Sequence, residues 1–340
     1  MKTEGHQSGG AVSRRSFLAS AAVGAASLLA SPRLIAAEPP PETKRIRLVH
    51  SPAICFAPQY IAEELLRLEG FTEVDYVKIS TNWATDALGN GEADFSMEAS
   101  PTLVHRLDAG KPVVALAGIH IGCYELFGTE RVRAIRDLKG KDIAVSGFGG
   151  ADHVLLASMM AYVGIDPRKD VNWITGQTIV AMELFAAGKA DAFMGFAPQP
   201  QELRARKIGH VIVNTAEDRP WSQYYCCMVA ARREFASGDP VATKRALRAL
   251  LKAADICSTE PEQVARYLVA KAYEPRYEIG LEVLKSLPYN RWREADPEDT
   301  LRFHTLRLHE VGMIKSSPQK LIAQGTDWRF LNELKKELKA

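Results

Sequence analysis

The sequence carries almost no excess charge of either sign. Its 43 Lys and Arg residues are matched by 41 Asp and Glu residues, which leaves a net charge of +2 over 340 residues. Proteins that bind nucleic acid or an anionic membrane surface concentrate positive charge. The balance argues against a polyanionic partner, and we expect no nucleic-acid binding.

Cysteine is also scarce. The chain has five, at Cys55, Cys123, Cys226, Cys227 and Cys257. Their number and irregular spacing predict neither a disulfide framework nor a zinc motif. An odd count leaves at least one thiol outside any pairing within the chain, and the adjacent Cys226 and Cys227 stand in an apolar run that favours burial. We expect no metal site and no cofactor.

A hydrophobic run of membrane-spanning length is missing at the N-terminus. The apolar stretch 17–30 is shorter than the roughly 20 residues that cross a bilayer. It follows the pair Arg14 and Arg15 and leads to a Pro-rich segment at 38–41, through which a helix would not continue. This pattern is typical of a twin-arginine export signal. We expect residues 1–37 to be a cleaved signal peptide and the mature chain to be a soluble periplasmic protein.

From Lys44 onward, strand and helix patterns alternate as in a parallel sheet covered by helices. Residues 46–49 read as a strand and 57–69 as a helix with one apolar stripe. A second unit repeats the order with a strand at 141–145 and a helix at 151–163. The pattern predicts an α/β fold.

A weak internal repeat joins these units. Residues 88–101 and 185–198 share five identities at an offset of 97, the same offset that superimposes the two strand-loop-helix units. We interpret the chain as one lobe built twice. The first lobe should comprise residues 44–125 and 224–340, and the second lobe residues 126–223. The apolar runs 113–121 and 224–231 are the expected connecting strands, with a ligand cleft between the lobes.

On these features the sequence resembles the type 2 periplasmic solute-binding proteins of ABC transporters, in the nitrate, sulfonate, taurine and thiamine-precursor family. The resemblance is carried by Gly91–Pro101 and its repeat Gly188–Pro198, by the glycine-rich loop 146–150, and by the export signal. It implies the type 2 periplasmic-binding-protein fold and a non-enzymatic, monomeric component of an ABC importer. Such a protein binds a small organic solute and delivers it to permease and ATPase subunits in the inner membrane.

The resemblance also implies that four segments line the cleft, namely 51–59, 98–102, 123–125 and 146–153. This agrees with the rule that ligands bind at the carboxyl ends of strands in open α/β sheets. From these segments and the matching places in the second lobe we expect the ligand-binding residues to be Cys55, Phe56, Gln59, Trp83, Glu98, Ser100, Ser146, Gly149, Gly150, His153, Phe196 and Gln199.

Each candidate also has a structural interpretation. The loop that contains Ser146, Gly149 and Gly150 could offer backbone N–H groups to an anionic or carbonyl oxygen, or be a plain tight turn. Its spacing fits no nucleotide motif. The rings of Phe56 and Trp83 could stack on a planar solute or belong to the core. His153 could equally bind solute or pack structurally.

Glu98 bears on the charge of the solute. A carboxylate beside the cleft disfavours an anionic ligand, and no Lys or Arg occurs in 50–65 or 144–165 to offset it. A neutral, zwitterionic or amine-bearing solute, such as a flat heterocycle, fits better than nitrate or a sulfonate.

Two alternatives remain open. One is an enzyme on the same fold, similar to a thiamine-pyrimidine synthase or a desulfinase, with Cys55 as nucleophile; this needs an activated thiolate. The other is a sensor subunit that presents solute to a receptor.

Overall fold

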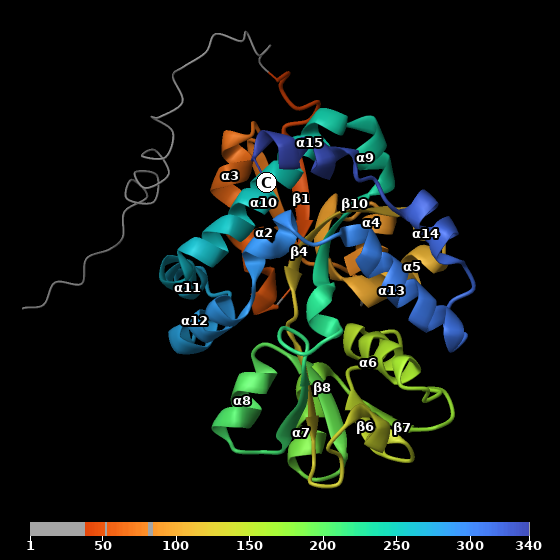
Figure 1. Ribbon diagram of the computed structural model, residues 1–340. Helices are drawn as coiled ribbons and strands as arrows, with labels where there is room; N and C mark the ends of the chain where they lie inside the picture. Colours follow the sequence, from red (N-terminus) through yellow and green to blue (C-terminus); the bar gives the residue numbers. More distant parts are fainter. Residues whose placement is uncertain (1–37, 52, 81–83, 340) are drawn as a thin grey trace, which may run out of the picture. The chain divides into compact units, whose positions relative to one another are not determined.

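The computed structural model describes residues 38–51, 53–80 and 84–339. The expected signal peptide, residues 1–37, and the candidate Trp83 lie outside these ranges. Residues 40–340 form one compact unit, shown as the coloured ribbon in Figure 1. Within the described part of the chain, every helix is too short or too polar to cross a membrane.

The first of two five-stranded sheets has the order β2-β1-β3-β10-β4. β1 runs parallel to β2 and β3, whereas β10 is antiparallel to both β3 and β4. The strands are β1 (Arg45–Val49), β2 (Glu73–Val77), β3 (Phe95–Ala99), β4 (Val113–Ile121) and β10 (Tyr225–Arg232). β4 is buried along its whole length, as its mostly apolar sequence predicts.

The second sheet repeats this arrangement in the order β7-β6-β8-β5-β9. β6 runs parallel to β7 and β8, and β5 is antiparallel to β8 and β9. The strands are β5 (Tyr124–Gly128), β6 (Asp142–Val145), β7 (Asn172–Thr175), β8 (Ala192–Phe196) and β9 (His210–Asn214). β3 and β8 occupy equivalent places 97 residues apart, which is the offset of the sequence repeat. The α/β prediction is confirmed.

The two repeated aspartates accept hydrogen bonds from the backbone of β1 and β6. Asp94 Oδ2 accepts a hydrogen bond from the backbone N–H of Arg47 in β1 at 3.0 Å, and Asp191 Oδ2 accepts one from the N–H of Asp142 in β6 at 3.2 Å. Arg47 also donates to both carboxylate oxygens of Asp94, at 3.1 and 2.7 Å. These contacts give Asp94 and Asp191 a structural role.

Helices cover both sheets (Figure 1). Those within the two repeats are η1 (Ile54–Phe56), α2 (Ala57–Ile61), α3 (Glu63–Leu68), α4 (Ala84–Gly89), α5 (Ser100–Asp108), η2 (Ile135–Leu138), α6 (Ala151–Tyr162), α7 (Thr178–Ala186) and α8 (Gln199–Ala205). The helix predicted at 57–69 is interrupted at Ala62, which divides it into α2 and α3.

After β10, a helical tail packs mainly on the first sheet and its helices. α10 contacts β4 and α2, and α14 contacts β4 and α5. The elements of this tail are α9 (Arg233–Gly238), α10 (Pro240–Thr259), α11 (Pro261–Ala270), α12 (Tyr277–Ser286), η4 (Tyr289–Arg293), α13 (Pro297–Glu310), α14 (Pro318–Gly325) and α15 (Arg329–Glu337).

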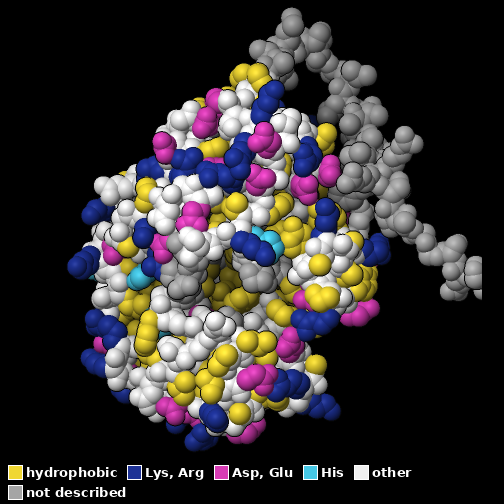
Figure 2. Space-filling model, turned by 180° about the vertical axis from the view of Figure 1, so that it is seen from behind, with side chains coloured by type: hydrophobic (Ala, Val, Ile, Leu, Met, Phe, Trp, Pro, Cys, Tyr) yellow, Lys and Arg dark blue, Asp and Glu magenta, His cyan; other side chains and the backbone are white. Residues whose placement is uncertain are grey.

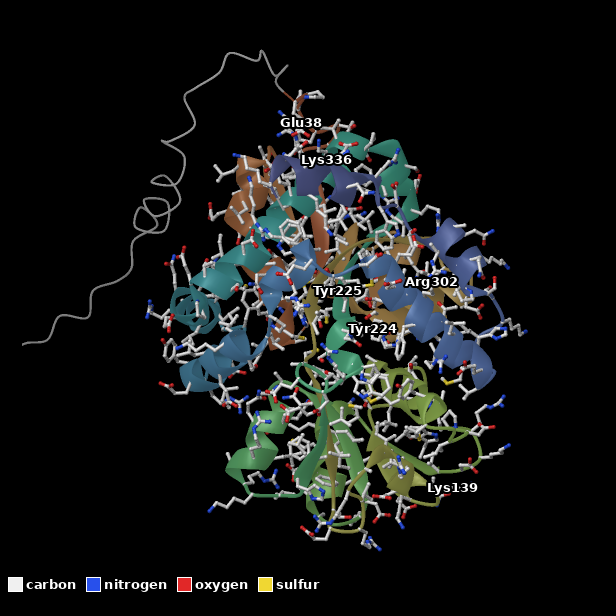
Figure 3. All side chains as sticks on the ribbon, viewed as in Figure 1. Glu38, Lys139, Tyr224, Tyr225, Arg302 and Lys336 are labelled. Carbon is white, nitrogen blue, oxygen red and sulfur yellow. The ribbon has the colours of Figure 1, made fainter. Side chains whose placement is uncertain are left out.

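The chain passes between the sheets twice. β4 leads through Gly122 and Cys123 into β5, and residues 215–224, which include η3 (Trp221–Gln223), return from β9 to β10. Figure 3 labels Tyr224 and Tyr225 at the end of this second passage. The two passages touch, because a Cβ on Gly122 would lie 2.3 Å from the Cα of Ala216. Gly122 also has φ of +68°, so both its conformation and its surroundings favour glycine.

Candidate functional site

A cavity of about 350 Å³ lies between the two sheets. The first sheet contributes residues that follow β1, together with the end of β3, and the second contributes the loop after β6 and the end of β8. The carboxyl ends of parallel strands therefore meet here, as the rule for open α/β sheets predicts. The lining residues are Val49, His50, Ser51, Ala53, Cys55, Phe56, Ile79, Ala84, Met97, Glu98, Ala99, Thr102, Cys123, Tyr124, Ser146, Ala151, Asp152, Phe196 and Cys227. In the space-filling view of Figure 2 the surface is hollowed, with hydrophobic side chains inside the hollow.

Five of the residues expected from the sequence line this cavity. They are Cys55, Phe56, Glu98, Ser146 and Phe196. Phe56 comes from the loop after β1 and Phe196 from the end of β8, so the cavity has an aromatic side chain from each sheet. The ring of Tyr124 lies 5.5 Å from that of Phe196, which adds a second aromatic residue to the wall of the second sheet.

Three other expected residues form hydrogen bonds with the backbone of the sheets instead of lining the cavity. Gln59 is buried between β1 and β3, where its Nε2 donates to Val49 O at 2.6 Å and its Oε1 accepts from Met97 N–H at 2.9 Å. Ser100 is buried and donates to backbone carbonyls of β10. Gln199 Oε1 accepts from Phe196 N–H at 3.1 Å. None of the three lines the cavity among the described residues.

The glycine-rich loop is held closed by its own side chains. Asp152 Oδ2 accepts from the Ser146 N–H at 2.5 Å, and Asp152 Oδ1 accepts from the Ser146 hydroxyl at 2.7 Å. The N–H of Gly149 donates to His153 Nδ1 at 3.2 Å, and that of Gly150 donates to a carbonyl in the loop. N–H groups that the sequence offered to a solute thus already have acceptors inside the protein.

His153 packs away from the cavity. Its ring lies 5.3 Å from that of Phe148 and 4.7 Å from that of Trp173, both edge to face. Burial lowers the pKa of His153 to about 4, so the imidazole is neutral at physiological pH. Like Gly149 and Gly150, His153 is absent from the described lining of the cavity.

Glu98 stands at the end of β3 and is 6% exposed. Burial raises the pKa of Glu98 to about 8. At neutral pH the side chain is therefore mostly a protonated carboxyl that can donate a hydrogen bond. Within the described part of the chain its Oε1 has no hydrogen-bond partner. Glu98 is thus a polar group at the cavity wall whose Oε1 can form a hydrogen bond with a solute.

Positive charge stays off the wall. No Lys or Arg is among the described residues that line the cavity. The charge of Arg106 in α5 still acts on the cavity wall, because it lowers the pKa of Glu98 and so opposes the effect of burial. Its Nη2 lies 3.7 Å from the Cβ position of Gly149, which places it beside the glycine-rich loop. The sequence indicated nothing about Arg106, since it lies seven residues beyond the end of β3 on a helix.

The sequence also missed a group of sulfur ligands. Cys123 and Cys227 line the cavity together with Cys55, and His120 lies next to them. Residue spacing carried no signal, because β4, β10 and the loop after β1 are neighbours only after the sheet has formed.

The sequence model of the family described as NMT1/THI5 like matches residues 58–264. No sequence among the curated proteins matches the chain.

Solved structures show the same fold at low identity. The nitrate-binding protein NrtA of Synechocystis PCC 6803 is 16% identical, with a TM-score of 0.73 over 88% of this chain and 90% of that one. The alkanesulfonate-binding protein SsuA of Xanthomonas axonopodis pv. citri, bound to MOPS, is 18% identical, with a TM-score of 0.68 over 86% of this chain and 100% of that one. The Candida albicans CA3427 gene product, whose fold is described as that of the periplasmic binding proteins, is 13% identical, with a TM-score of 0.67 over 83% of this chain and 96% of that one.

The family match covers more than half of the 340 residues, and the structural likeness covers 83–88% of the chain. The chain therefore belongs to the NMT1/THI5-like family and has the periplasmic-binding-protein fold.

Proposed function

We propose that this chain is the extracytoplasmic solute-binding component of an ABC importer and binds a small organic solute in the cavity between its sheets. The observation that carries the proposal is a cavity of about 350 Å³ walled by the strand ends of both sheets. That volume lies in the usual range for small-molecule sites. The names of the similar structures, which include nitrate-binding and alkanesulfonate-binding proteins, support a binding role.

The mechanism is a shift of population between open and closed forms. The first sheet with its helices forms one lobe and the second sheet with its helices the other, and the two passages of the chain act as the hinge. A solute that contacts Glu98 in one lobe and Phe196 in the other makes both contacts only in the closed form. Binding then stabilises the closed form, which the permease recognises.

The solute is neutral, zwitterionic or amine-bearing. The lining offers aromatic rings, a protonated carboxyl and the buried Asp152, without a cationic side chain among its described residues. The rings of Phe56, Tyr124 and Phe196 suit a flat heterocycle. A sulfonate or nitrate would leave its charge without a counterion at the wall.

Location and partners follow from the N-terminus and the family. A twin-arginine signal at residues 1–37 would place the folded monomer in the periplasm. There it would deliver solute to the permease and ATPase subunits of the inner membrane.

The alternative of an enzyme with Cys55 as nucleophile is less well supported. Cys55 is 2% exposed. A hydrogen bond with Cys123 lowers the pKa of Cys55, but the hydrogen bond with Cys227 and burial outweigh it and raise the pKa to about 11. Catalytic cysteines need the opposite shift.

Small-angle scattering with a solute panel tests the proposal. Pyrimidines, polyamines, amino acids, carboxylates and sulfonates are screened by thermal shift, and the radius of gyration is measured with each solute that binds. We expect compaction with at least one solute, weaker binding of that solute by Phe196→Ala, and unchanged binding by Leu68→Ala, which alters an exposed residue on α3. An unchanged radius of gyration with every tightly bound solute would contradict the mechanism.

A further inference from the structure

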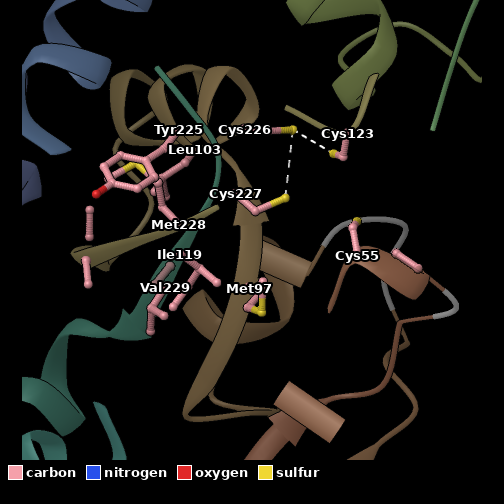
Figure 4. Packing of buried hydrophobic residues seen from close by; sticks show 14 of the residues in the cluster. Cys55, Met97, Leu103, Ile119, Cys123, Tyr225, Cys226, Cys227, Met228 and Val229 are labelled. Carbon is pink, nitrogen blue, oxygen red and sulfur yellow. Dashed lines mark hydrogen bonds between the residues drawn. The ribbon is translucent and has the colours of Figure 1, made fainter. Parts of the chain in front are cut away.

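Four side chains that could ligate a metal meet at the wall of the cavity. They are Cys55 in η1, His120 in β4, Cys123 in the first passage and Cys227 in β10. One ligand atom from each lies within 4.8 Å of all the others, and all four residues are buried. Figure 4 shows Cys55, Cys123 and Cys227 around this place, which lies beyond the end of β3.

The sheet register produces the cluster. β10 lies between β3 and β4, and Cys227 pairs with both Ala99 and His120. Cys123 follows three residues after His120, where the chain leaves the first sheet. The loop after β1 brings Cys55, whose carbonyl accepts a hydrogen bond from the Tyr289 hydroxyl at 3.1 Å. The four ligands thus come from four separate segments that the fold itself fixes.

The imidazole of His120 supplies an independent indication. It is 0% exposed, and its Nδ1 lies 3.0 Å from the carbonyl oxygen of Gly122. A carbonyl only accepts, so Nδ1 carries the proton and donates. The other nitrogen, Nε2, has no hydrogen-bond partner among the described residues. A buried nitrogen without a partner is costly, and metal-binding histidines usually donate the hydrogen of their other ring nitrogen to a backbone carbonyl, as Nδ1 does here.

Three thiols and one imidazole are a ligand set with a defined preference. Thiolates favour soft and borderline cations such as Zn²⁺ and Cu⁺, and three cysteines with one histidine form a common tetrahedral zinc site. Sulfur and nitrogen ligands of one tetrahedral ion lie within 4.8 Å of one another, because each is only about 2.0–2.3 Å from the ion.

We infer that Cys55, His120, Cys123 and Cys227 form a binding site for a thiophilic cation of the Zn²⁺ or Cu⁺ type at the wall of the cavity. On binding, each ligating thiol loses its proton to solvent, and Nε2 of His120 provides its lone pair after releasing any proton that it holds. Three of the ligands line the cavity, so the cation lies beside the solute space. The inference rests on the proposed function only for the role of that cavity. Metal binding is measured separately from solute binding.

A disulfide between Cys226 and Cys123 would compete with metal binding. The Sγ of Cys226 lies 2.7 Å from that of Cys123 and 3.9 Å from that of Cys227. Oxidation of Cys123 with Cys226 would remove a ligand. The protein is therefore reduced and treated with chelator before the titration, and its thiols are counted.

The experiment titrates the full chain with Cd²⁺, a spectroscopic stand-in for Zn²⁺, and then with Zn²⁺ itself. We expect one equivalent bound per chain, an ultraviolet sulfur-to-cadmium charge-transfer band, proton release, and a higher thermal midpoint. Cys55→Ser, Cys227→Ser and His120→Gln should each weaken binding by about tenfold or more. Cys257→Ser is the matched control, because Cys257 is equally buried in α10 but does not belong to the cluster.

Circular dichroism establishes that each variant is folded, and Cys226→Ala tests whether the ligand set requires this fourth sulfur. The inference would be overturned if reduced, folded protein bound no stoichiometric Zn²⁺ and showed no charge-transfer band. Loss of binding in Cys257→Ser equal to that in Cys227→Ser would also overturn it. Neither result would affect compaction with an organic solute.

Discussion

Asp152 accepts hydrogen bonds from both the backbone N–H and the hydroxyl of Ser146, at 2.5 and 2.7 Å. Asp152 is buried in the first turn of α6, and Ser146 directly follows β6 and opens the glycine-rich loop. The carboxylate thus occupies the place where an anionic solute would meet these donors. This pair turns a loop of the anion-binding type into a closed structural turn with a negative charge.

Removing this carboxylate should destabilise the protein. Asp152→Ala leaves the half-buried Ser146 donors without their partner, at a cost of about 1–3 kcal/mol in the free energy of unfolding. Asp75→Ala removes an exposed ion pair with Arg45 and should change that free energy by no more than about 0.5 kcal/mol. Urea unfolding of both variants measures the difference, and equal effects would contradict the role given to Asp152.

Glu98 should make stability fall as the pH rises. Its pKa is about 8 in the folded protein because of burial, against 4.5 when exposed, so the folded state binds the extra proton between these values. The stability that Glu98 contributes in its protonated form is fully present below pH 4.5 and is lost as the pH rises toward 8. Above pH 8 it changes no further. The slope approaches about 1.4 kcal/mol per pH unit within that window.

Urea unfolding from pH 5 to 9 tests this dependence by comparing the native chain with Glu98→Gln, which keeps the shape and cannot ionise. The difference in unfolding free energy between the two proteins should change across the window. A constant difference would show that Glu98 titrates normally.

Comparison of Gly122 with Gly140 separates the cost of a positive φ from the cost of a steric clash when a glycine is replaced. Both have positive φ, at +68° and +74°. A Cβ on Gly122 would also collide with the backbone of Ala216, whereas one on Gly140 meets nothing within 4 Å. Gly140→Ala should cost about 1 kcal/mol in unfolding free energy, from the conformation alone. Gly122→Ala should cost well over that, or prevent folding, and similar values for both variants would contradict close contact between the passages.

Cys55 should react slowly with alkylating reagents in the native protein. Its pKa of about 11 leaves little thiolate at pH 8, and burial adds a steric barrier. Mass spectrometry after a timed pulse of iodoacetamide locates the modified residues, with urea-unfolded protein as the reference in which all five cysteines react. Native Cys55 labelled faster than the unfolded reference would revive the enzyme alternative.

Much of the framework could be predicted from the sequence. The strand at 141–145 and the helix at 151–163 appear as β6 and α6, because apolar periodicity and a terminating Gly164 are local signals. The equivalence of β3 and β8 follows from the repeated Ala-Asp pattern. The division at Ala62 was not predicted, since the apolar stripe runs through it unbroken.

The candidate site was less accessible to sequence reasoning. Segments after strand ends were expected to gather, and Phe56, Glu98 and Phe196 line one cavity between the sheets. Their neighbours Gln59 and Ser100 lie on the same segments, but they turn to backbone partners that belong to other strands. The sequence predicted which residues stand at a strand end, but not the direction in which each side chain points or the group that it contacts.

The sequence by itself determined the balanced charge, the α/β alternation and the duplicated unit, since these depend on composition and on contacts a few residues apart. Only the tertiary structure decided which polar groups serve the framework and which face the cavity. It also gathered Cys55, His120, Cys123 and Cys227, which are spread over 173 positions and fit no spacing motif. The physical reason is that β10 inserts between β3 and β4 although it follows β4 by about 100 residues in the sequence. This long-range pairing brings the four side chains together, and a local stretch of sequence cannot predict it.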